Sequence, residues 1–96
     1  MEDKLTLHAA VRSRTRGIPT TAIKAAIEFG RYRSGRGADL YTIGWREIKL
    51  SSKNGLDLSR WMGIEVVCAR DGEVITVYRN KNQRALRDRP TRQPAA

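Results

Sequence analysis

The most informative stretch of the chain is IEVVCARDGEVITVYR, residues 64–79, in which two runs rich in β-branched residues flank Asp71-Gly72. An Asp-Gly pair between two such runs is a strong signal for a β-hairpin with a two-residue turn. We therefore predict two antiparallel strands that are joined at Asp71-Gly72.

A two-residue turn also fixes the register of the hairpin, and side chains then alternate between its two faces. The predicted pairs are Ala69 with Val74, Cys68 with Ile75, Val67 with Thr76, Val66 with Val77, and Glu65 with Tyr78. One face is then wholly apolar, and we expect helices to cover it. Its residues are Val66, Cys68, Ile75 and Val77.

The opposite face of the hairpin is mixed, and it includes Glu65 and Tyr78. It also carries an apolar strip of Val67, Ala69 and Val74, which a small monomer would rarely expose. We expect the strip to be covered by residues 45–61, with Trp61 as the anchor, or by a second copy of the chain in a homodimer.

Two helices are predicted before the hairpin, over residues 5–16 and 20–29. Thr6 is a favourable N-cap for the first, and Gly17 is typical of a left-handed helix stop. Thr20 or Thr21 is the predicted N-cap of the second, and Gly30 ends it. Apolar periodicity groups Leu7, Ala10, Val11 and Arg14 on one face of the first helix. The core stripe of the second is Ile23, Ala26 and Ile27, and we expect Ile23 and Ile27 to lie over the hairpin.

The middle of the chain predicts a short strand, a glycine-rich turn over 34–38 and a second short strand that begins near Leu40. Residues 45–61 fit one or two helical turns closed by Asn54-Gly55, followed by an irregular connection. The predicted fold is therefore α+β, with two N-terminal helices packed on a small antiparallel sheet. We expect residues 1–80 to form a single domain and 81–96 to form a basic, partly disordered tail.

The composition points to a polyanionic partner. The 96 residues include 19 Lys and Arg against 10 Asp and Glu, a net charge of +9. Such an excess favours nucleic acid, then an acidic protein, and only distantly an anionic membrane surface. Without a signal peptide or a long apolar run, the sequence predicts a cytoplasmic protein that is not bound to a membrane.

The sequence argues against disulfide, zinc and nucleotide-phosphate sites, because it has one cysteine, one histidine and no phosphate-binding glycine motif. Cys68 has no partner for an intrachain disulfide, and its mid-strand position indicates a core residue. His8 is the only histidine, which argues against a histidine-rich zinc site. Because the chain also lacks a phosphate-binding glycine motif, we expect no metal and no cofactor.

The first candidate group is His8, Arg12 and Arg16, spaced four residues apart on the first helix. This spacing forms one stripe about 12 Å long. Two arginines can bind a phosphodiester while the imidazole moves a proton near neutral pH. The alternative is a solvated helix face without a function.

A second group lies at the end of the hairpin, where Glu65 faces Tyr78 with Thr76 and Arg79 nearby. A carboxylate beside a phenol can position a sugar hydroxyl, and a phenol can stack on a base. The alternative is an ordinary polar pair on a half-exposed sheet.

The third group is the run of cations after the last strand. Such a run binds RNA or DNA by releasing counterions, without reading the base sequence. The alternative is a solubilising tail. The predicted nucleic-acid-binding residues are Arg79, Lys81, Arg84, Arg87 and Arg89.

These features resemble a family of small bacterial domains of unknown function that is grouped with the BrnT and RelE/ParE toxins. The similarity rests on His8-Ala9-x-x-Arg12-x-x-x-Arg16-Gly17-Ile18, a short second helix and the terminal strand VITVYR, residues 74–79. It covers residues 7–80, although 31–62 match loosely. Within that stretch, the glycine-rich residues 34–38 and the segment 45–61 are longer than a minimal toxin needs.

The resemblance implies two N-terminal helices against an antiparallel sheet. It places the chain beside type II toxins, some of which cut mRNA on ribosomes without a metal, and it implies an acidic antitoxin as partner. Tyr78, Arg79 and Lys81 resemble by location the aromatic and basic residues of those nucleases, while His8, Arg12 and Arg16 match the motif of the family itself.

Two functional hypotheses follow. The first is a metal-independent endoribonuclease of a toxin–antitoxin system, and its candidate catalytic residues are His8, Arg12, Arg16, Glu65 and Tyr78. The second is a non-catalytic module that binds nucleic acid or protein with the same cations. A helix-turn-helix reader is less favoured, because the second helix offers only Lys24 and Glu28 as long polar side chains.

Overall fold

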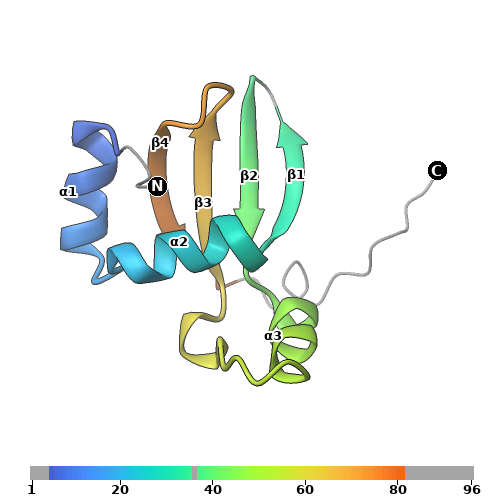
Figure 1. Ribbon diagram of the computed structural model, residues 1–96. Coiled ribbons are helices and arrows are strands. Elements are labelled where there is room, and N and C mark those ends of the chain that lie inside the picture. Colours follow the sequence, from blue (N-terminus) through green and yellow to red (C-terminus); the bar gives the residue numbers. More distant parts are fainter. Residues whose placement is uncertain (1–4, 36, 82–96) are drawn as a thin grey trace.

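The computed structural model describes residues 5–35 and 37–81. Its strands form one antiparallel sheet in the order β1-β2-β3-β4, and the two N-terminal helices precede it (Figure 1). The predicted α+β fold is confirmed. The elements are α1 (Leu7–Thr15), α2 (Thr20–Phe29), β1 (Arg31–Gly35), β2 (Ala38–Thr42), α3 (Trp45–Ser52), the 3₁₀ turn η1 (Ser59–Trp61), β3 (Ile64–Ala69) and β4 (Val74–Arg79).

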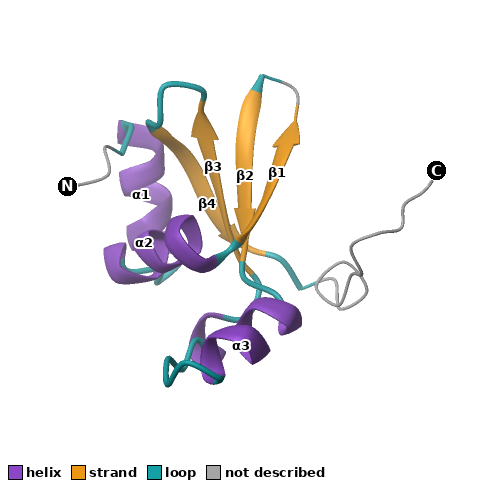
Figure 2. Cartoon of the chain, turned by 45° about the vertical axis from the view of Figure 1, so that its right-hand side comes forward, coloured by secondary structure: helices purple, strands orange, loops and turns teal. Residues whose placement is uncertain are grey.

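The core lies between α2 and the sheet, as Figure 2 shows from the side. Ile23 of α2 is fully buried against Val66 and Val77, as predicted, whereas Ile27 is only partly buried. Pro19, and not Thr20 or Thr21, occupies the N-cap position of α2.

Helix α1 lies beside β4 and not over the face of the sheet. Thr6 is its N-cap, as predicted, and the Thr6 hydroxyl accepts a hydrogen bond from the Ala9 amide at 3.1 Å.

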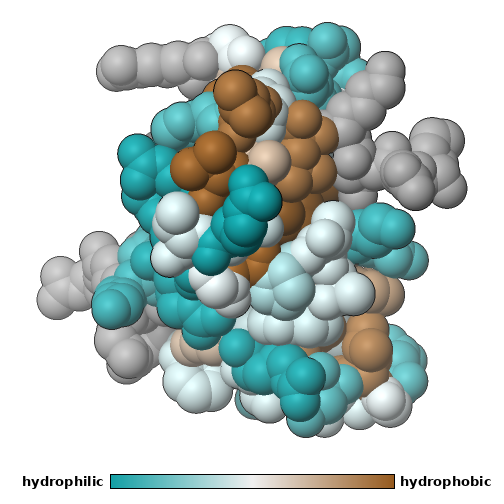
Figure 3. All heavy atoms as spheres, turned by 90° about the vertical axis from the view of Figure 1, so that its left-hand side faces the viewer, coloured by the Kyte–Doolittle hydropathy of each residue, from teal (hydrophilic) through white to brown (hydrophobic). Residues whose placement is uncertain are grey.

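The predicted face of α1 is wrong, because its buried residue is Ala9 while Leu7 is 81% exposed. A helix that packs beside a strand needs only a narrow contact, and a small side chain allows the closest approach. Leu7 and Val11 therefore remain exposed. Figure 3 views the molecule from the side on which α1 lies, where apolar surface adjoins hydrophilic surface.

The segment around α1 protects the outer edge of β4. The Thr6 amide donates to the Val74 carbonyl at 2.9 Å, and the Thr6 hydroxyl donates to the Ile75 carbonyl at 3.1 Å. Farther along, Arg16 Nη1 donates to the Val77 carbonyl at 3.1 Å. These bonds occupy carbonyl groups that an edge strand would otherwise offer to another chain, and they show that α1 and β4 run in the same direction.

The β3–β4 hairpin turns at Asp71-Gly72, but its loop has three residues, Arg70 to Gly72. The Ala69 amide donates to the Glu73 carbonyl at 2.8 Å, and Gly72 adopts a φ of +96°. A type I turn followed by a residue with positive φ gives this longer loop. The predicted two-residue turn is therefore wrong.

A β-bulge then restores the predicted register. Cys68 pairs with Val74 and Val67 with Thr76, so Ile75 is the extra residue on β4. The pairs Val67–Thr76, Val66–Val77 and Glu65–Tyr78 are confirmed. The one-residue shift from the loop and the one-residue bulge cancel beyond Ile75.

The bulge exchanges the faces of two neighbouring residues. Val74 is fully buried beside Cys68, while Ile75 is 36% exposed, the reverse of the prediction. The predicted apolar strip of Val67, Ala69 and Val74 is consequently wrong, because Val74 lies on the helix-covered face and the other two are half-buried.

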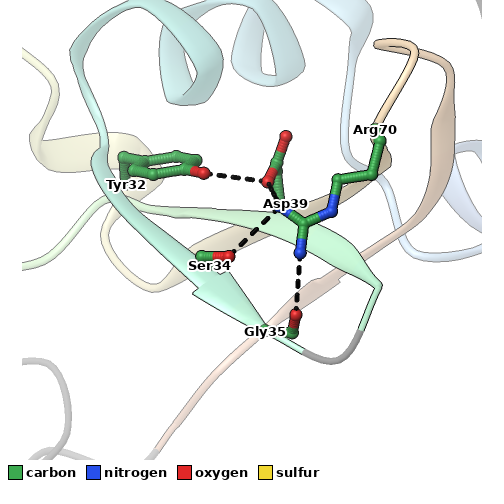
Figure 4. A network of polar contacts seen from close by, with 5 residues as sticks. All are labelled: Tyr32, Ser34, Gly35, Asp39 and Arg70. Atoms are coloured by element: carbon green, nitrogen blue, oxygen red, sulfur yellow. Dashed lines mark hydrogen bonds and ion pairs between the residues drawn. The ribbon is translucent and has the colours of Figure 1, made fainter.

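A polar cluster ties the tips of the two hairpins together on the helix side of the sheet (Figure 4). Arg70 donates to Asp39 at 2.8 Å, to the Ser34 hydroxyl at 3.1 Å and to the Gly35 carbonyl at 3.1 Å. Tyr32 donates to the same Asp39 oxygen at 2.9 Å. Arg70 thus fixes the β1–β2 hairpin against the β3–β4 turn.

Candidate nucleic-acid interface

The sheet face opposite α2 carries a row of polar side chains at one end. Thr42, Glu65 and Tyr78 are cross-strand neighbours on β2, β3 and β4. They alternate with Val66 and Val77, which face the core. Strand pairing therefore brings a hydroxyl, a carboxylate and a phenol side by side.

Glu65 is only 5% exposed and is held by hydrogen-bond donors. Its Oε2 accepts hydrogen bonds from the Thr42 hydroxyl at 3.0 Å and from Asn80 Nδ2 at 3.2 Å. A buried carboxylate is stable in a protein when its lone pairs are satisfied in this way.

Tyr78 is half-buried, and its phenol is a weaker acid than that of a free tyrosine. Burial, followed by the hydrogen bond to Glu65 and the charge of Glu65, raises the pKa of Tyr78 to about 12, although Arg33 opposes the shift. The phenol is therefore neutral near pH 7, and it lies beside the Glu65 carboxylate. Arg33 projects from β1 on the same sheet face, as its pairing with Leu40 requires.

A cleft of about 470 Å³ lies at the end of β4, and it is lined by Arg16, Tyr78, Arg79 and Lys81. Arg16 reaches it from the end of α1, because α1 runs alongside β4 in the same direction. Since Arg16 uses Nη1 for the Val77 carbonyl, its position is fixed while its other N–H groups stay available. Among the described residues, the lining combines three cations and a phenol without an acidic side chain, and such a surface suits a phosphodiester.

His8 and Arg12 lie away from the cleft. Arg12 Nε donates to His8 Nε2 at 3.4 Å, so the two exposed side chains contact each other. The start of α1 lies near Val74 and Ile75, whereas Arg16 lies near Val77. Two helical turns, about 12 Å, thus separate His8 from Arg16. The structure brings Arg16, Glu65 and Tyr78 together, and it places His8 and Arg12 elsewhere on α1.

The structure describes two of the five predicted nucleic-acid-binding residues. Arg79 and Lys81 line the cleft, while Arg84, Arg87 and Arg89 lie outside the described residues. Thr42 and Asn80, which donate to Glu65, and Arg33, whose charge acts on Tyr78, were not predicted. Asn80 could have been found from the sequence, because it directly follows the predicted terminal strand. Arg33 and Thr42 could not, because their positions depend on the pairing of β2 with β1 and β3, which the glycine-rich turn leaves open.

Within residues 5–35 and 37–81, no three His, Cys, Asp or Glu side chains lie close enough to share a metal ion. No helix in this part of the chain is long and apolar enough to cross a membrane. Comparisons with family models, with curated proteins and with solved structures found no match.

Proposed function

We propose that the protein binds RNA in the cleft at the end of β4 and cleaves the RNA backbone there without a metal ion. The observation that carries the proposal is the lining of this cleft, in which three cations surround a phenol that lies directly across the strands from the buried Glu65 carboxylate.

Binding rests on Arg16, Arg79 and Lys81. Guanidinium groups match the geometry of a phosphate, and a lysine adds a mobile point charge. These contacts position the strand but do not read its bases. We therefore expect affinity for many RNA sequences, with a strong dependence on salt concentration.

Cleavage would use the pair of Tyr78 and Glu65. The Tyr78 oxygen accepts the proton of the ribose 2′-hydroxyl while the phenol proton passes to the Glu65 carboxylate. The 2′-oxygen then forms a bond to phosphorus, the bond from phosphorus to the 5′-oxygen breaks, and Lys81 protonates the leaving oxygen. The products are a 2′,3′-cyclic phosphate and a 5′-hydroxyl. Arg16 and Arg79 stabilise the charge that develops on the phosphoryl oxygens. His8 and Arg12 have no part in this step.

One observation favours the second candidate, an RNA-binding module without cleavage. Acid–base catalysis is most efficient when the pKa of the catalytic group lies near the working pH. The pKa of Tyr78, about 12, is far above neutrality, and His8 lies outside the cleft. The two candidates share the binding surface and differ only in whether the pair of Tyr78 and Glu65 moves a proton.

The test is RNA cleavage by the pure protein, free and on translating ribosomes, with and without EDTA. We expect cleavage that EDTA does not change and that Tyr78→Phe lowers by about 10²- to 10⁴-fold. Tyr32→Phe is the matched control, because Tyr32 is exposed on the other face of the sheet. RNA that is bound but stays intact would establish the binding module, and RNA that is neither bound nor cut would refute both.

A further inference from the structure

Helix α3 presents an aromatic and basic side to solvent. Trp45 is 50% exposed, and Lys49 and Lys53 follow it at intervals of four residues, a spacing that aligns them in one row. Together with Ile48 and Ser52, they line an open groove of about 480 Å³. This surface, the α3 groove, shares no residue with the cleft at the end of β4.

The exposed charges of α3 have one sign. The only acid of the helix, Glu47, is buried, and its Oε1 accepts a hydrogen bond from the Gly44 amide at 2.8 Å. Arg46, Lys49 and the adjoining Lys53 are exposed. The surface of α3 therefore attracts an anion, and the indole beside it offers a flat apolar face.

We infer that the α3 groove binds single-stranded RNA, with one base stacked on Trp45 and the neighbouring phosphates on Lys49 and Lys53. Stacking on an aromatic side chain requires unpaired bases, because the bases of a duplex already stack on each other. An acidic peptide would satisfy the lysines but would leave the indole without an aromatic partner. The inference rests on the proposed function, which it extends from one phosphodiester to a longer strand.

The groove and the cleft lie at the same end of the sheet. The Asn80 amide donates to the Gly63 carbonyl at 2.7 Å, and the Gly63 amide donates to the Ile43 carbonyl at 2.7 Å. Asn80, which separates Arg79 from Lys81, is thus about 10 Å from Ile43 across two strand spacings. Ile43 precedes Trp45 by two residues, and both ribbon views show α3 beyond this end (Figures 1 and 2). One strand of a few nucleotides can therefore contact both sites.

The experiment measures the affinity of a fluorescein-labelled 2′-O-methyl oligouridylate dodecamer, which cannot be cut through its 2′-oxygen. We expect Trp45→Ala to weaken binding about 5- to 150-fold, the effect of losing one base–aromatic stack. Leu50→Ala is the matched control, because Leu50 is equally exposed on α3 but does not line the groove. The dodecamer should also quench tryptophan emission in the wild type and much less in Trp45→Ala.

The contribution of Lys49 and Lys53 is measured by the salt dependence of the affinity. Lys49→Gln and Lys53→Gln should each reduce the slope of log affinity against log salt by about 0.7, the value for one phosphate contact on a single strand. Lys24→Gln on α2, also exposed, should leave the slope unchanged. Circular dichroism of each variant shows whether the fold is retained.

Three results would overturn the inference. If Trp45→Ala matches Leu50→Ala while Arg79→Gln weakens binding, the cleft holds the RNA and the α3 groove does not. If the dodecamer does not bind the wild type, the proposed function fails as well. If an oligoglutamate peptide quenches Trp45 and the dodecamer does not, the groove is a protein-binding surface.

Discussion

The phenol of Tyr78 and the carboxylate of Glu65, which is 5% exposed, are neighbours on the sheet face opposite α2. The register of β3 and β4 places the two residues directly across from each other. Arg16 reaches the same end of the sheet from α1, and Arg79 and Lys81 complete the cleft. This pair is the centre of the proposed site, because it joins a buried negative charge to a cationic surface through one exchangeable proton.

The raised pKa of Tyr78 predicts a pH dependence of stability. The folded chain favours the neutral phenol, so Tyr78 contributes fully below pH 10, the ordinary pKa, and loses this contribution as the pH rises from 10 toward about 12. Urea unfolding across this window should show a steeper fall for the wild type than for Tyr78→Phe. Parallel curves for the wild type and Tyr78→Phe would contradict the assignment.

The bulge at Ile75 predicts opposite effects at neighbouring positions. Val74→Ala removes two methyl groups from a fully buried site and should lower the free energy of unfolding by about 2–3 kcal/mol. Ile75→Ala removes more atoms but from the surface, and it should cost less than about 1 kcal/mol. Urea denaturation compares the two variants. A larger loss of stability for Ile75→Ala than for Val74→Ala would contradict the bulge and support the register without it.

Gly63 should tolerate no side chain. Its φ is +86°, and a Cβ there would lie 2.6 Å from the Asn80 carbonyl oxygen, in the ladder that supports the end of β4. Gly55 has a similar φ of +79°, but its Cβ would meet no atom within 4 Å. Gly55→Ala should therefore cost about 1 kcal/mol of stability, the strain of the left-handed conformation alone, and Gly63→Ala distinctly more. Equal losses in thermal unfolding would show that the contact with Asn80 is relieved at no cost.

The local signals in the sequence predicted more of the fold than of the site. Thr6, Gly17 and Asp71-Gly72 act within a few residues, so the first helix and the hairpin were placed correctly. The loop length and the bulge at Ile75 were missed, because each changes the register by one residue and only the packing of Val74 distinguishes the alternatives. The pairing of Glu65 with Tyr78 was predicted correctly, because the register shift from the longer loop and the shift from the bulge cancel before the strands reach this pair.

The site as a whole depends on contacts between distant segments. The spacing of His8, Arg12 and Arg16 correctly indicates one stripe, but it cannot show that α1 lies beside β4 and brings only Arg16 to the cleft. The influence of Arg33 on Tyr78 likewise requires the pairing of β1, β2, β3 and β4. Both arrangements depend on which distant segments pack together, which no local pattern specifies.

The most direct test of the RNA-binding cleft compares Arg79→Gln with Arg14→Gln. Both residues are exposed arginines, but only Arg79 lines the cleft. With the labelled dodecamer measured at several salt concentrations, Arg79→Gln should lower the affinity and reduce the salt slope by about 0.7, while Arg14→Gln should change neither. An equal loss in both variants would show that the RNA responds only to net charge, and it would contradict a defined site at the end of β4.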